Sequence, residues 1–488
     1  MSYLSLPRMP RVLRGVLFSA SLVGALPAPV AAAGDAITLD ALPLLFVDDG
    51  AVASSHGLVR TVHAARTRPE PVIEPERPWE GEHVYTYGSV HRDPATGLFR
   101  LWYMAHSRVL HSTSPDGVTW TRTVAGLHDF QGSKDNNIVA TGFHAPAVID
   151  DAFERDPSKR FKLLGNTGGK FHGAHSADGL IWHRYAKDPL FEGSDTSTLT
   201  QDPRTGEYLA YFKRRSDQVP GRVVWLTRSR DFVNWSEAKL VFHADAEDDR
   251  WAMKPDQRTE IYNMSVVPHA AGFVGFPTMF RVMHRIPRSQ PVPGSQSRDD
   301  GPIDVQLVTS RDGENWARSY PRISVIPRGE PGTYDGGALL GVTSAAVHAG
   351  DETWMLYTAI NTGHGGTLPP KCLTIGRATW RRHGFASLDA NSAGGSLRSR
   401  PLLIAGGVLE LNADASRGEL RVELREVDGS PLPDFLLADC EPLRGDATRH
   451  RVSWKSDLPV PADRPLQVVV EMRGARLFSL SGGAETVP

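Results

Sequence analysis

The chain has 488 residues, 40% of them hydrophobic, and a formal net charge of −2 at pH 7. This length predicts two domains, and the hydrophobic content is high enough for folded cores, which excludes a disordered chain. Because the chain has no basic excess to neutralise phosphates, nucleic acid is excluded as an expected partner.

The first 33 residues have the pattern of an export signal. Arg8, Arg11 and Arg14 give a basic start, a mostly apolar stretch follows from 16 to 30, and three alanines precede Gly34. We expect cleavage after residue 33 and a secreted or periplasmic protein with no membrane contact afterwards; an uncleaved anchor is the alternative. No later segment has the run of about 18 apolar residues that a membrane span needs.

A short repeat, Ser-x-Asp-Gly-x-x-Trp, organises the middle of the chain. It occurs at 114–120, 176–182 and 310–316, and at 229–235 in a form without the glycine. Asp-Gly between two β runs predicts a hairpin, because glycine takes a positive φ at little cost. The Ser and Asp side chains can bond to nearby backbone amides, and the Trp starts the outer strand. We therefore expect the aspartates of this repeat to be structural, namely Asp116, Asp178 and Asp312.

A second repeat, Asp-Pro-x-Thr-Gly followed by an alternating strand, lies upstream of the first. It occurs at 93–97 and 202–206, with looser forms at 155–160, 269–272 and 348–351. Four antiparallel strands repeated five times predict a five-bladed β-propeller over 34–385, which hides its sheet edges by radial closure. The five units lie near 85–122, 136–185, 195–237, 260–319 and 340–382.

Beyond about residue 386 the pattern changes to short strands separated by Gly and Asp turns. Alternating or apolar runs at 407–412, 418–424 and 465–471 predict a C-terminal β-sandwich over 386–488. The fold class is therefore expected to be all-β. The two cysteines, Cys372 and Cys440, form either one disulfide that ties the two domains together or two buried thiols.

Propeller-plus-sandwich order, together with these two turn motifs, resembles the five-bladed glycoside hydrolases related to families 32, 43 and 68. The resemblance is greatest to the divergent, secreted, bacterial family-32-like group, and residues 436–440 and 445–446 resemble the sandwich appended in that group. It implies a glycoside hydrolase acting on O-glycosyl bonds of a poly- or oligosaccharide. Fructan-cleaving members carry a W-M-N-D-P-N-G-like segment with the nucleophilic Asp. The early acidic pairs here, Asp48–Asp49 and Glu80/Glu82, do not match it.

Glycoside hydrolysis needs two carboxyl groups that flank the scissile bond, one donating a proton and the other attacking the sugar or activating water. In a propeller these groups are expected in the axial funnel, just before the innermost strands. Asp195, Glu260 and Asp335 hold this position in three successive units. We expect Glu260 to be the general acid and Asp195 or Asp335 the base or nucleophile, with the remaining acid orienting sugar hydroxyls. The alternative is that each acid caps a loop or pairs with an arginine.

Other polar side chains near the expected inner strands predict substrate contacts, although solvated surface positions are the alternative for each. No metal-binding or nucleotide-binding motif occurs, so no cofactor is expected, while a structural calcium ion held by loop carboxylates near the axis stays open. The predicted substrate-binding residues are Asp49, His91, Asn136, Asn137, His144, Lys254, Asn263 and His364.

Two other functions compete with the paired-carboxylate hydrolase. One is a non-catalytic glycan-binding propeller, and the other is a hydrolase or lyase of different chemistry. Two carboxylates about 5–10 Å apart across one pocket favour hydrolysis. Acids that are all engaged by arginines, or that face outward, favour the binding protein. A carbohydrate is the expected partner in either case, and the sugar, its linkage and the oligomeric state stay open.

Overall fold

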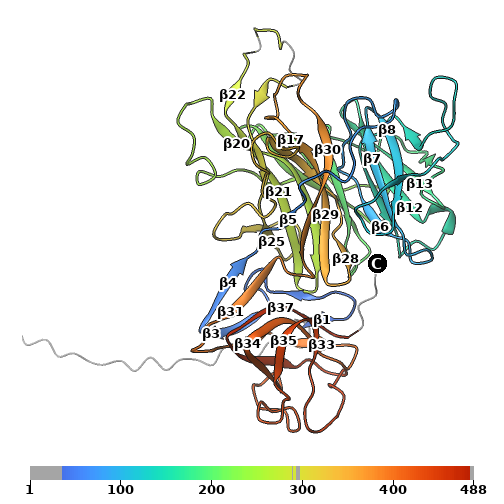
Figure 1. Cartoon of the computed structure of the whole chain (residues 1–488). Coiled ribbons are helices and arrows are strands. Elements are labelled where there is room, and N and C mark those ends of the chain that lie inside the picture. The colour runs from blue at the N-terminus through green and yellow to red at the C-terminus, as the bar shows by residue number, and fades with distance from the viewer. Residues whose placement is uncertain (1–35, 288, 293–296, 484–488) are drawn as a thin grey trace, which may run out of the picture.

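The computed structural model describes residues 36–287, 289–292 and 297–483 (Figure 1). This part of the chain consists of β-strands and loops, with one 3₁₀ turn at Pro157–Lys159 and no α-helix. The expected all-β class is confirmed. No helix in these ranges is long and apolar enough to cross a membrane. The expected signal peptide, residues 1–33, lies outside them.

Three antiparallel sheets follow one another along the first half of the chain. The first contains β6 (Val90–Arg92), β7 (Phe99–Ala105), β8 (Arg108–Ser114), β9 (Thr121–Arg122) and β10 (Ile138–Thr141). The second contains β11 (His144–Asp150), β12 (Phe161–Thr167), β13 (Lys170–Ser176), β14 (His183–Arg184) and β15 (Phe191–Glu192). The third contains β16 (Ser197–Gln201), β17 (Tyr208–Arg215), β18 (Arg222–Ser229) and β19 (Lys239–Phe242).

A larger sheet joins the last two expected units, because β24 and β27 pair in parallel. Its first half contains β20 (Arg258–His269), β21 (Gly272–Val282), β24 (Ile303–Val305), β25 (Val308–Ser310) and β26 (Trp316–Arg318). Its second half contains β27 (Ala338–Val342), β28 (Val347–Ala349), β29 (Glu352–Ile360), β30 (Leu373–Arg381) and β5 (Arg66–Thr67). A small hairpin beside it pairs β22 (His284–Arg285) with β23 (Asp299–Asp300).

The C-terminal unit recruits strands from the start of the chain and lies below the other sheets in Figure 1. Its nine-stranded sheet contains β2 (Leu44–Leu45), β3 (Val52–His56), β4 (Leu58–Val62), β31 (Ala386–Ala390), β32 (Gly395–Ser399), β34 (Glu410–Arg425), β35 (Leu443–Arg451), β36 (Gln467–Arg473) and β37 (Ala475–Ser481). In addition, β1 (Ile37–Leu39) pairs with β33 (Leu402–Ile404). The strands of residues 37–62 thus pair with strands of the C-terminal unit, and not with the region that was expected to begin at residue 34.

One further strand also departs from the expected units. Residues 138–141 were expected to belong to the unit at 136–185, but they form β10, which pairs with β8 of the first sheet. The innermost strand of the second sheet is β11, which starts at His144. The two asparagines before β10 therefore belong to the first sheet.

The turn repeats behave as expected. In the first, Ser114 Oγ accepts the N–H of Gly117 at 2.8 Å, and Asp116 Oδ1 accepts the N–H of Val118 at 2.8 Å. Asp178 and Asp312 make the same bonds in their turns. Their structural role is confirmed.

Each glycine of these turns also packs on an aromatic side chain of a neighbouring sheet, which the sequence did not predict. Gly179 lies against Trp102, whose Nε1 donates to the Gly179 carbonyl at 2.7 Å. Gly313 lies against Tyr211 in the same way, with an O–H···O distance of 2.9 Å. Gly117 of the first sheet lies against Trp354 of β29. The contact therefore links the first sheet with the last.

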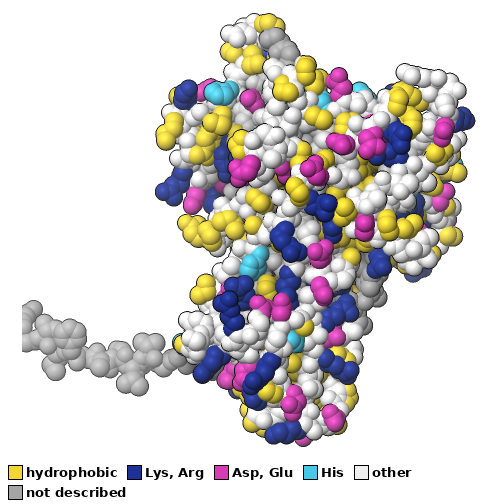
Figure 2. Space-filling view, viewed as in Figure 1, with side chains coloured by type: hydrophobic (Ala, Val, Ile, Leu, Met, Phe, Trp, Pro, Cys, Tyr) yellow, Lys and Arg dark blue, Asp and Glu magenta, His cyan; other side chains and the backbone are white. Residues whose placement is uncertain are grey.

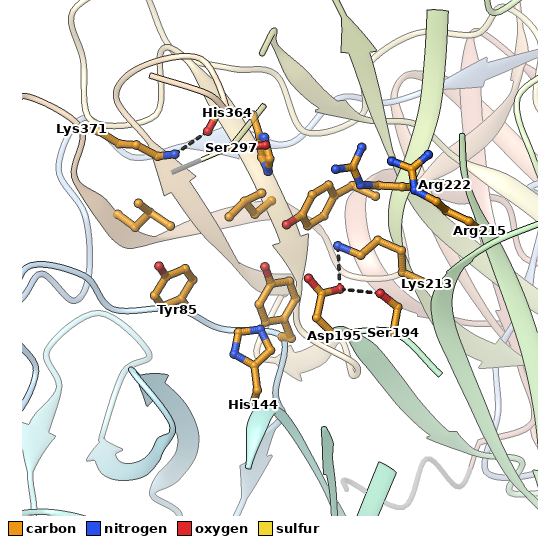
Figure 3. A pocket seen from close by; sticks show the side chains of 14 residues that line it. Tyr85, His144, Ser194, Asp195, Lys213, Arg215, Arg222, Ser297, His364 and Lys371 are labelled. Carbon is orange, nitrogen blue, oxygen red and sulfur yellow. Dashed lines mark hydrogen bonds and ion pairs between the residues drawn. The ribbon is translucent and has the colours of Figure 1, made fainter. Parts of the chain in front are cut away.

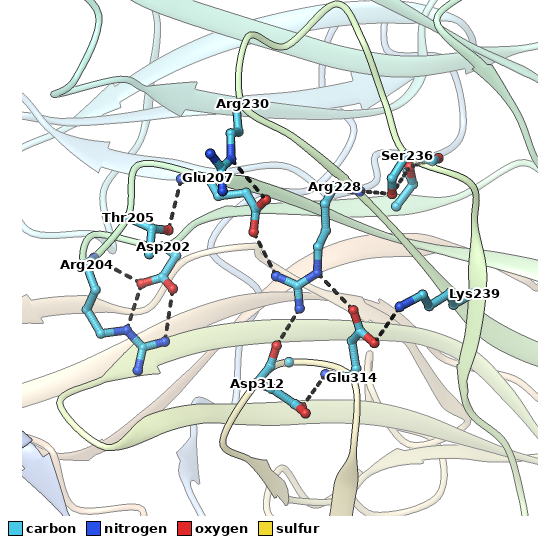
Figure 4. A network of polar contacts seen from close by, with 12 residues as sticks. Asp202, Arg204, Thr205, Glu207, Arg228, Arg230, Ser236, Lys239, Asp312 and Glu314 are labelled. Carbon is cyan, nitrogen blue, oxygen red and sulfur yellow. Dashed lines mark hydrogen bonds and ion pairs between the residues drawn. The ribbon is translucent and has the colours of Figure 1, made fainter. Parts of the chain in front are cut away.

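An arginine adds to two of these contacts. Figure 4 shows Arg228 of β18 directed at the turn of the following sheet, where it donates to the Asp312 carbonyl and lies 3.2 Å from Glu314. Arg100 of β7 donates to the Asp178 carbonyl in the corresponding place. At both places the contact between neighbouring sheets combines a turn glycine packed on an aromatic ring with a hydrogen bond from an arginine to the adjacent carbonyl.

Replacing Gly179 by Ala is expected to destabilise the protein by about 2–4 kcal/mol. The residue has a φ of +73°, which costs about 1–2 kcal/mol for an alanine. A Cβ there would also lie 2.6 Å from the Trp102 ring. Gly168 is the matched control, because its φ of +61° is similar but nothing lies within 4 Å of its Cβ position. Urea unfolding should show a smaller loss for Gly168→Ala; equal losses would contradict the packing contact.

The inner strands contact one another in a closed ring, in which the Val148 N–H of β11 donates to Ser89 Oγ, beside β6 of the first sheet, at 3.1 Å. Strand β11 lies beside β16, β16 beside β20, and β20 beside β27. Ser265 Oγ of β20 donates to the Val342 carbonyl of β27 at 2.6 Å. The ring closes where the Ser344 N–H donates to the Gly88 carbonyl at 2.9 Å, which joins the last sheet to the first.

Charges of both signs are interspersed over the face of the molecule drawn in Figure 2, on the upper sheets and on the C-terminal unit. Across the junction of these two parts, Arg381 donates to Asn412 Oδ1 at 2.6 Å and pairs with Asp446 at 2.5 Å. Polar contacts therefore fix the C-terminal unit to β30.

Candidate functional site in the central pocket

A cavity of about 400 Å³ opens at the centre of the ring of inner strands. Each expected unit contributes at least one side chain, and Figure 3 shows these side chains converging on one space. The lining residues are Tyr85, Tyr87, His144, Ser194, Asp195, Lys213, Arg215, Arg222, Tyr262, Ser297, Leu340, His364, Lys371 and Leu373. The pocket is therefore a shared product of all these sheets.

Asp195 is the one carboxylate among the lining residues, and its side chain is half exposed. Its Oδ1 lies 2.8 Å from Nζ of Lys213, and Ser194 Oγ donates to the same oxygen at 3.3 Å. Burial acts to raise the pKa of Asp195, but the charge and hydrogen bond of Lys213 outweigh it, so the pKa is lowered. Asp195 is therefore ionised at neutral pH.

Two tyrosines of the pocket, Tyr85 and Tyr87, and its two histidines are neutral. Burial raises the pKa of Tyr85 to about 12 and that of Tyr87 well above its usual range, so both keep their protons. Burial also lowers the pKa of His144 and, to about 3, that of His364. Lys213 Nζ lies 3.7 Å from the centroid of the Tyr262 ring, a cation–π distance. The walls thus combine aromatic faces, phenol hydroxyls and neutral imidazoles.

Glu260, the expected general acid, does not line the pocket. It is fully buried, Arg258 Nε donates to its Oε1 at 2.8 Å, and Arg222 Nη1 donates to its Oε2. Burial acts to raise the pKa of Glu260, but the two arginines outweigh it and lower the pKa. Since a general acid must hold its proton near neutral pH, these contacts favour the alternative of an arginine-paired structural carboxylate.

Asp335 also lies away from the pocket, and its side chain is buried. Tyr357 donates its hydroxyl to Oδ2 of Asp335 at 2.8 Å, and Thr333 donates to Oδ1 at 3.1 Å. These bonds fix the loop before β27. The structure therefore brings only Asp195 of the three predicted acids into the pocket.

Two of the predicted substrate-binding residues, His144 and His364, line the pocket. Asn263 is buried in β20, where its Oδ1 accepts the Met264 N–H at 2.8 Å. His91 Nε2 lies 2.9 Å from the Val148 carbonyl between the first two sheets. Neither lines the cavity.

The remaining predicted contacts are structural or lie on the surface. Asn136 and Asn137 are buried before β10, and Asn137 accepts the Trp79 indole N–H at 2.7 Å. Lys254 is exposed, and Asp49 pairs with Arg60 at 2.5 Å beside the C-terminal sheet. None of these four side chains reaches the pocket.

The sequence reasoning missed the basic side chains of the pocket. Lys213 and Arg215 end β17, and Arg222 begins β18, so the hairpin that joins these strands carries all three to the cavity. The site was expected to consist of acids before inner strands, whereas these residues lie on the second and third strands of their sheet. The alternation of Lys213 and Arg215 at the end of an apolar strand is the signal that could have located them.

In the described part of the chain, no group of three or more His, Cys, Asp or Glu side chains is arranged to hold a metal ion. The described residues therefore offer no set of ligands for the calcium ion that the sequence left open. Cys372 and Cys440 are free thiols, so the disulfide alternative is wrong. Cys440 lies in the core of the C-terminal unit, whereas the Sγ of Cys372 faces the Glu82 carbonyl near the pocket loops.

No protein-family model matches the chain, and no curated protein matches it either. Among solved structures, it is similar to an endo-1,4-beta-xylanase from Bacteroides thetaiotaomicron, at 16% identity and a TM-score of 0.40, over 64% of this chain and 92% of that one. It is also similar to an alpha-L-arabinofuranosidase from Podospora anserina in complex with cellotriose, at 10% identity and a TM-score of 0.42, over 66% and 98%. A third match is an N-acetylgalactosamine deacetylase from F. plautii in complex with blood group B trisaccharide, at 14% identity and a TM-score of 0.38, over 71% and 94%. At these identities and TM-scores the similarity assigns no function to the chain.

Proposed function

We propose that the sheets around the pocket are the blades of a five-bladed β-propeller and that the C-terminal unit is a β-sandwich. The closed ring of inner strands and the turn glycine of the first sheet on Trp354 of the last support radial closure. We also propose that residues 1–33 are cleaved as a signal peptide and that the protein is secreted or periplasmic.

The proposed function is recognition of a poly- or oligosaccharide in the central pocket. The observation that carries it is a cavity of about 400 Å³ whose walls combine three tyrosines with charged and polar side chains. This volume lies in the range of about 300–1,000 Å³ usual for small-molecule sites. Aromatic faces can cover the apolar faces of sugar rings, while the polar groups bond to hydroxyls. Binding is favoured over paired-carboxylate hydrolysis because Glu260 and Asp335 are both engaged away from the cavity.

A glycoside hydrolase is the second candidate, and Asp195 is the observation that favours it. An ionised, half-exposed carboxylate in the pocket beside neutral His144 suits a base or nucleophile. In this candidate the proton donor is a group other than a carboxyl. Lys371, whose pKa burial lowers to about 8, is the lining residue with a proton affinity suited to that task.

One panel of oligo- and polysaccharides, scored for both binding and sugar release, separates these candidates. We expect the purified protein to bind at least one glycan without releasing sugar. If sugar is released, Asp195→Asn should lower the rate by about 10²–10⁴-fold and still bind. Asp217→Asn, which changes an exposed carboxylate on the β17–β18 hairpin, is the matched control. Absence of binding and release across the whole panel would contradict both candidates.

A further inference from the structure

The pocket is strongly biased towards positive charge. Four of its charged side chains are basic and one, Asp195, is acidic. The basic side chains are Lys213, Arg215, Arg222 and Lys371. Since the whole chain has a net charge of −2, this bias is local to the pocket and does not follow from composition.

Two of these side chains form a pair. Arg215 and Arg222 lie directly opposite each other in the register of β17 and β18, so their side chains leave the same face of the hairpin. Figure 3 shows the two guanidinium groups side by side at the edge of the pocket. The adjacent pair, Arg214 and Val223, leaves the opposite face, where Arg214 lies over Trp225.

The nearby carboxylates leave part of this charge uncompensated. Four arginines, which are Arg215, Arg222, Arg258 and Arg285, share two carboxylates, Glu260 and Asp299. Four positive charges against two negative charges leave an excess of two. Arg215 is the least engaged, since its single ion pair has an N···O distance of 3.8 Å and its side chain is half exposed.

Arg222 keeps donors available to a ligand. Its Nη1 bonds to Glu260 and, at 3.0 Å, to Asp299. Its Nε and Nη2 have no hydrogen-bond partner in the part of the chain that the structure describes. Because the two carboxylates hold the guanidinium in place, little side-chain entropy is lost when a ligand binds these donors.

We propose that Arg215 and Arg222 recognise a negatively charged substituent, a carboxylate or a sulfate ester, on the saccharide. This inference rests on the proposed function, because it places the charged group on a saccharide in the same pocket. Planar guanidinium groups match the two oxygens of such an anion in a forked geometry that hydroxyl groups do not offer. The tyrosines of the other walls are left to contact the neutral part of the sugar.

Matched pairs of glycans test the inference. Oligogalacturonides are compared with their methyl esters, and a sulfated galactan with its desulfated form, by titration calorimetry at low and high salt. We expect the acidic member of at least one pair to bind at least about tenfold more tightly, and the preference to shrink as salt rises. A preference within the galacturonide pair identifies a carboxylate, and one within the galactan pair a sulfate.

Two variants complete the test. Arg215→Gln should remove most of the preference for the acidic glycan, measured as the ratio of the dissociation constants of the neutral and acidic members of the pair. Arg214→Gln, one position away on the opposite face, should keep the preference, and the melting temperatures of both variants show whether they fold. Neutral glycans that bind as tightly as acidic ones, or a preference that survives in Arg215→Gln, would overturn the inference and leave saccharide recognition standing. Absence of binding by any glycan would overturn the proposed function and the inference with it.

Discussion

Replacing Glu260 by Gln is expected to lower the free energy of unfolding by about 3–5 kcal/mol. Glu260 is fully buried and is the common acceptor of Arg222 and Arg258. A neutral amide removes the counter-charge that these two arginines share, whose side chains are only 15% and 19% exposed. The NH₂ group of the amide is also a donor, and it would face the guanidinium donors. Urea unfolding at neutral pH, followed by fluorescence, measures the loss.

The exposed Asp256 lies in the loop before β20 and provides the control for this variant. Asp256→Asn should change the stability by less than about 0.5 kcal/mol, because it breaks no buried pair. A Glu260→Gln variant that keeps full stability and loses sugar release would contradict the structural role, and would restore the general acid expected from the sequence. A large loss of stability instead assigns Glu260 to the support of Arg222, and through it to the pocket.

The parts of the fold that could be predicted from the sequence are those with local causes. Asp116, Gly117 and their counterparts reveal hairpins, since a positive φ and a side chain bonded to nearby amides are properties of a few adjacent residues. The pairing of β3 and β4 with strands more than 300 residues later has no such local signal. Residues 37–62 were therefore placed in the region 34–385, although their strands pair with strands of the C-terminal unit.

The same distinction applies to the site. Asp195, His144 and His364 were located because they lie beside inner strands or in a polar, glycine-rich loop. Whether a carboxylate is accessible or paired with an arginine depends on residues that are distant in sequence. Arg222 is 38 residues from Glu260 in sequence and reaches it from a different sheet. Sequence spacing predicted where the acids lie, but not which of them arginines already neutralise.

Replacing Glu80 by Gln is expected to cost about 3–5 kcal/mol, by the same reasoning as for Glu260. Glu80 is fully buried and accepts from Tyr103 at 2.6 Å and from Arg122 at 2.8 Å. It also accepts the backbone N–H groups of Glu76 and Arg77 at 2.9 and 3.0 Å. These bonds hold the loop that leads to Tyr85 and Tyr87, so the variant should also weaken the proposed binding of a glycan although Glu80 lies outside the pocket.

The pH dependence of stability provides a second measurement on the same residue. Burial acts to raise the pKa of Glu80, but the hydrogen bonds of Arg122 and Tyr103 outweigh it, and the pKa falls below its ordinary value of 4.5. A carboxyl whose pKa is lower in the folded state stabilises the protein above the unfolded-state pKa, and this stability is lost as pH falls through the folded-state pKa. Urea unfolding between about pH 6 and 3 should therefore show a shallower decline for Glu80→Gln than for the natural protein. Glu82→Gln, which changes an exposed neighbour, should follow the natural curve.

Parallel curves for Glu80→Gln and the natural protein would mean that Glu80 has the same pKa folded and unfolded. In that case Arg122 and Tyr103 would not hold the carboxylate in its charged form, and the loop beside the pocket would depend on packing alone.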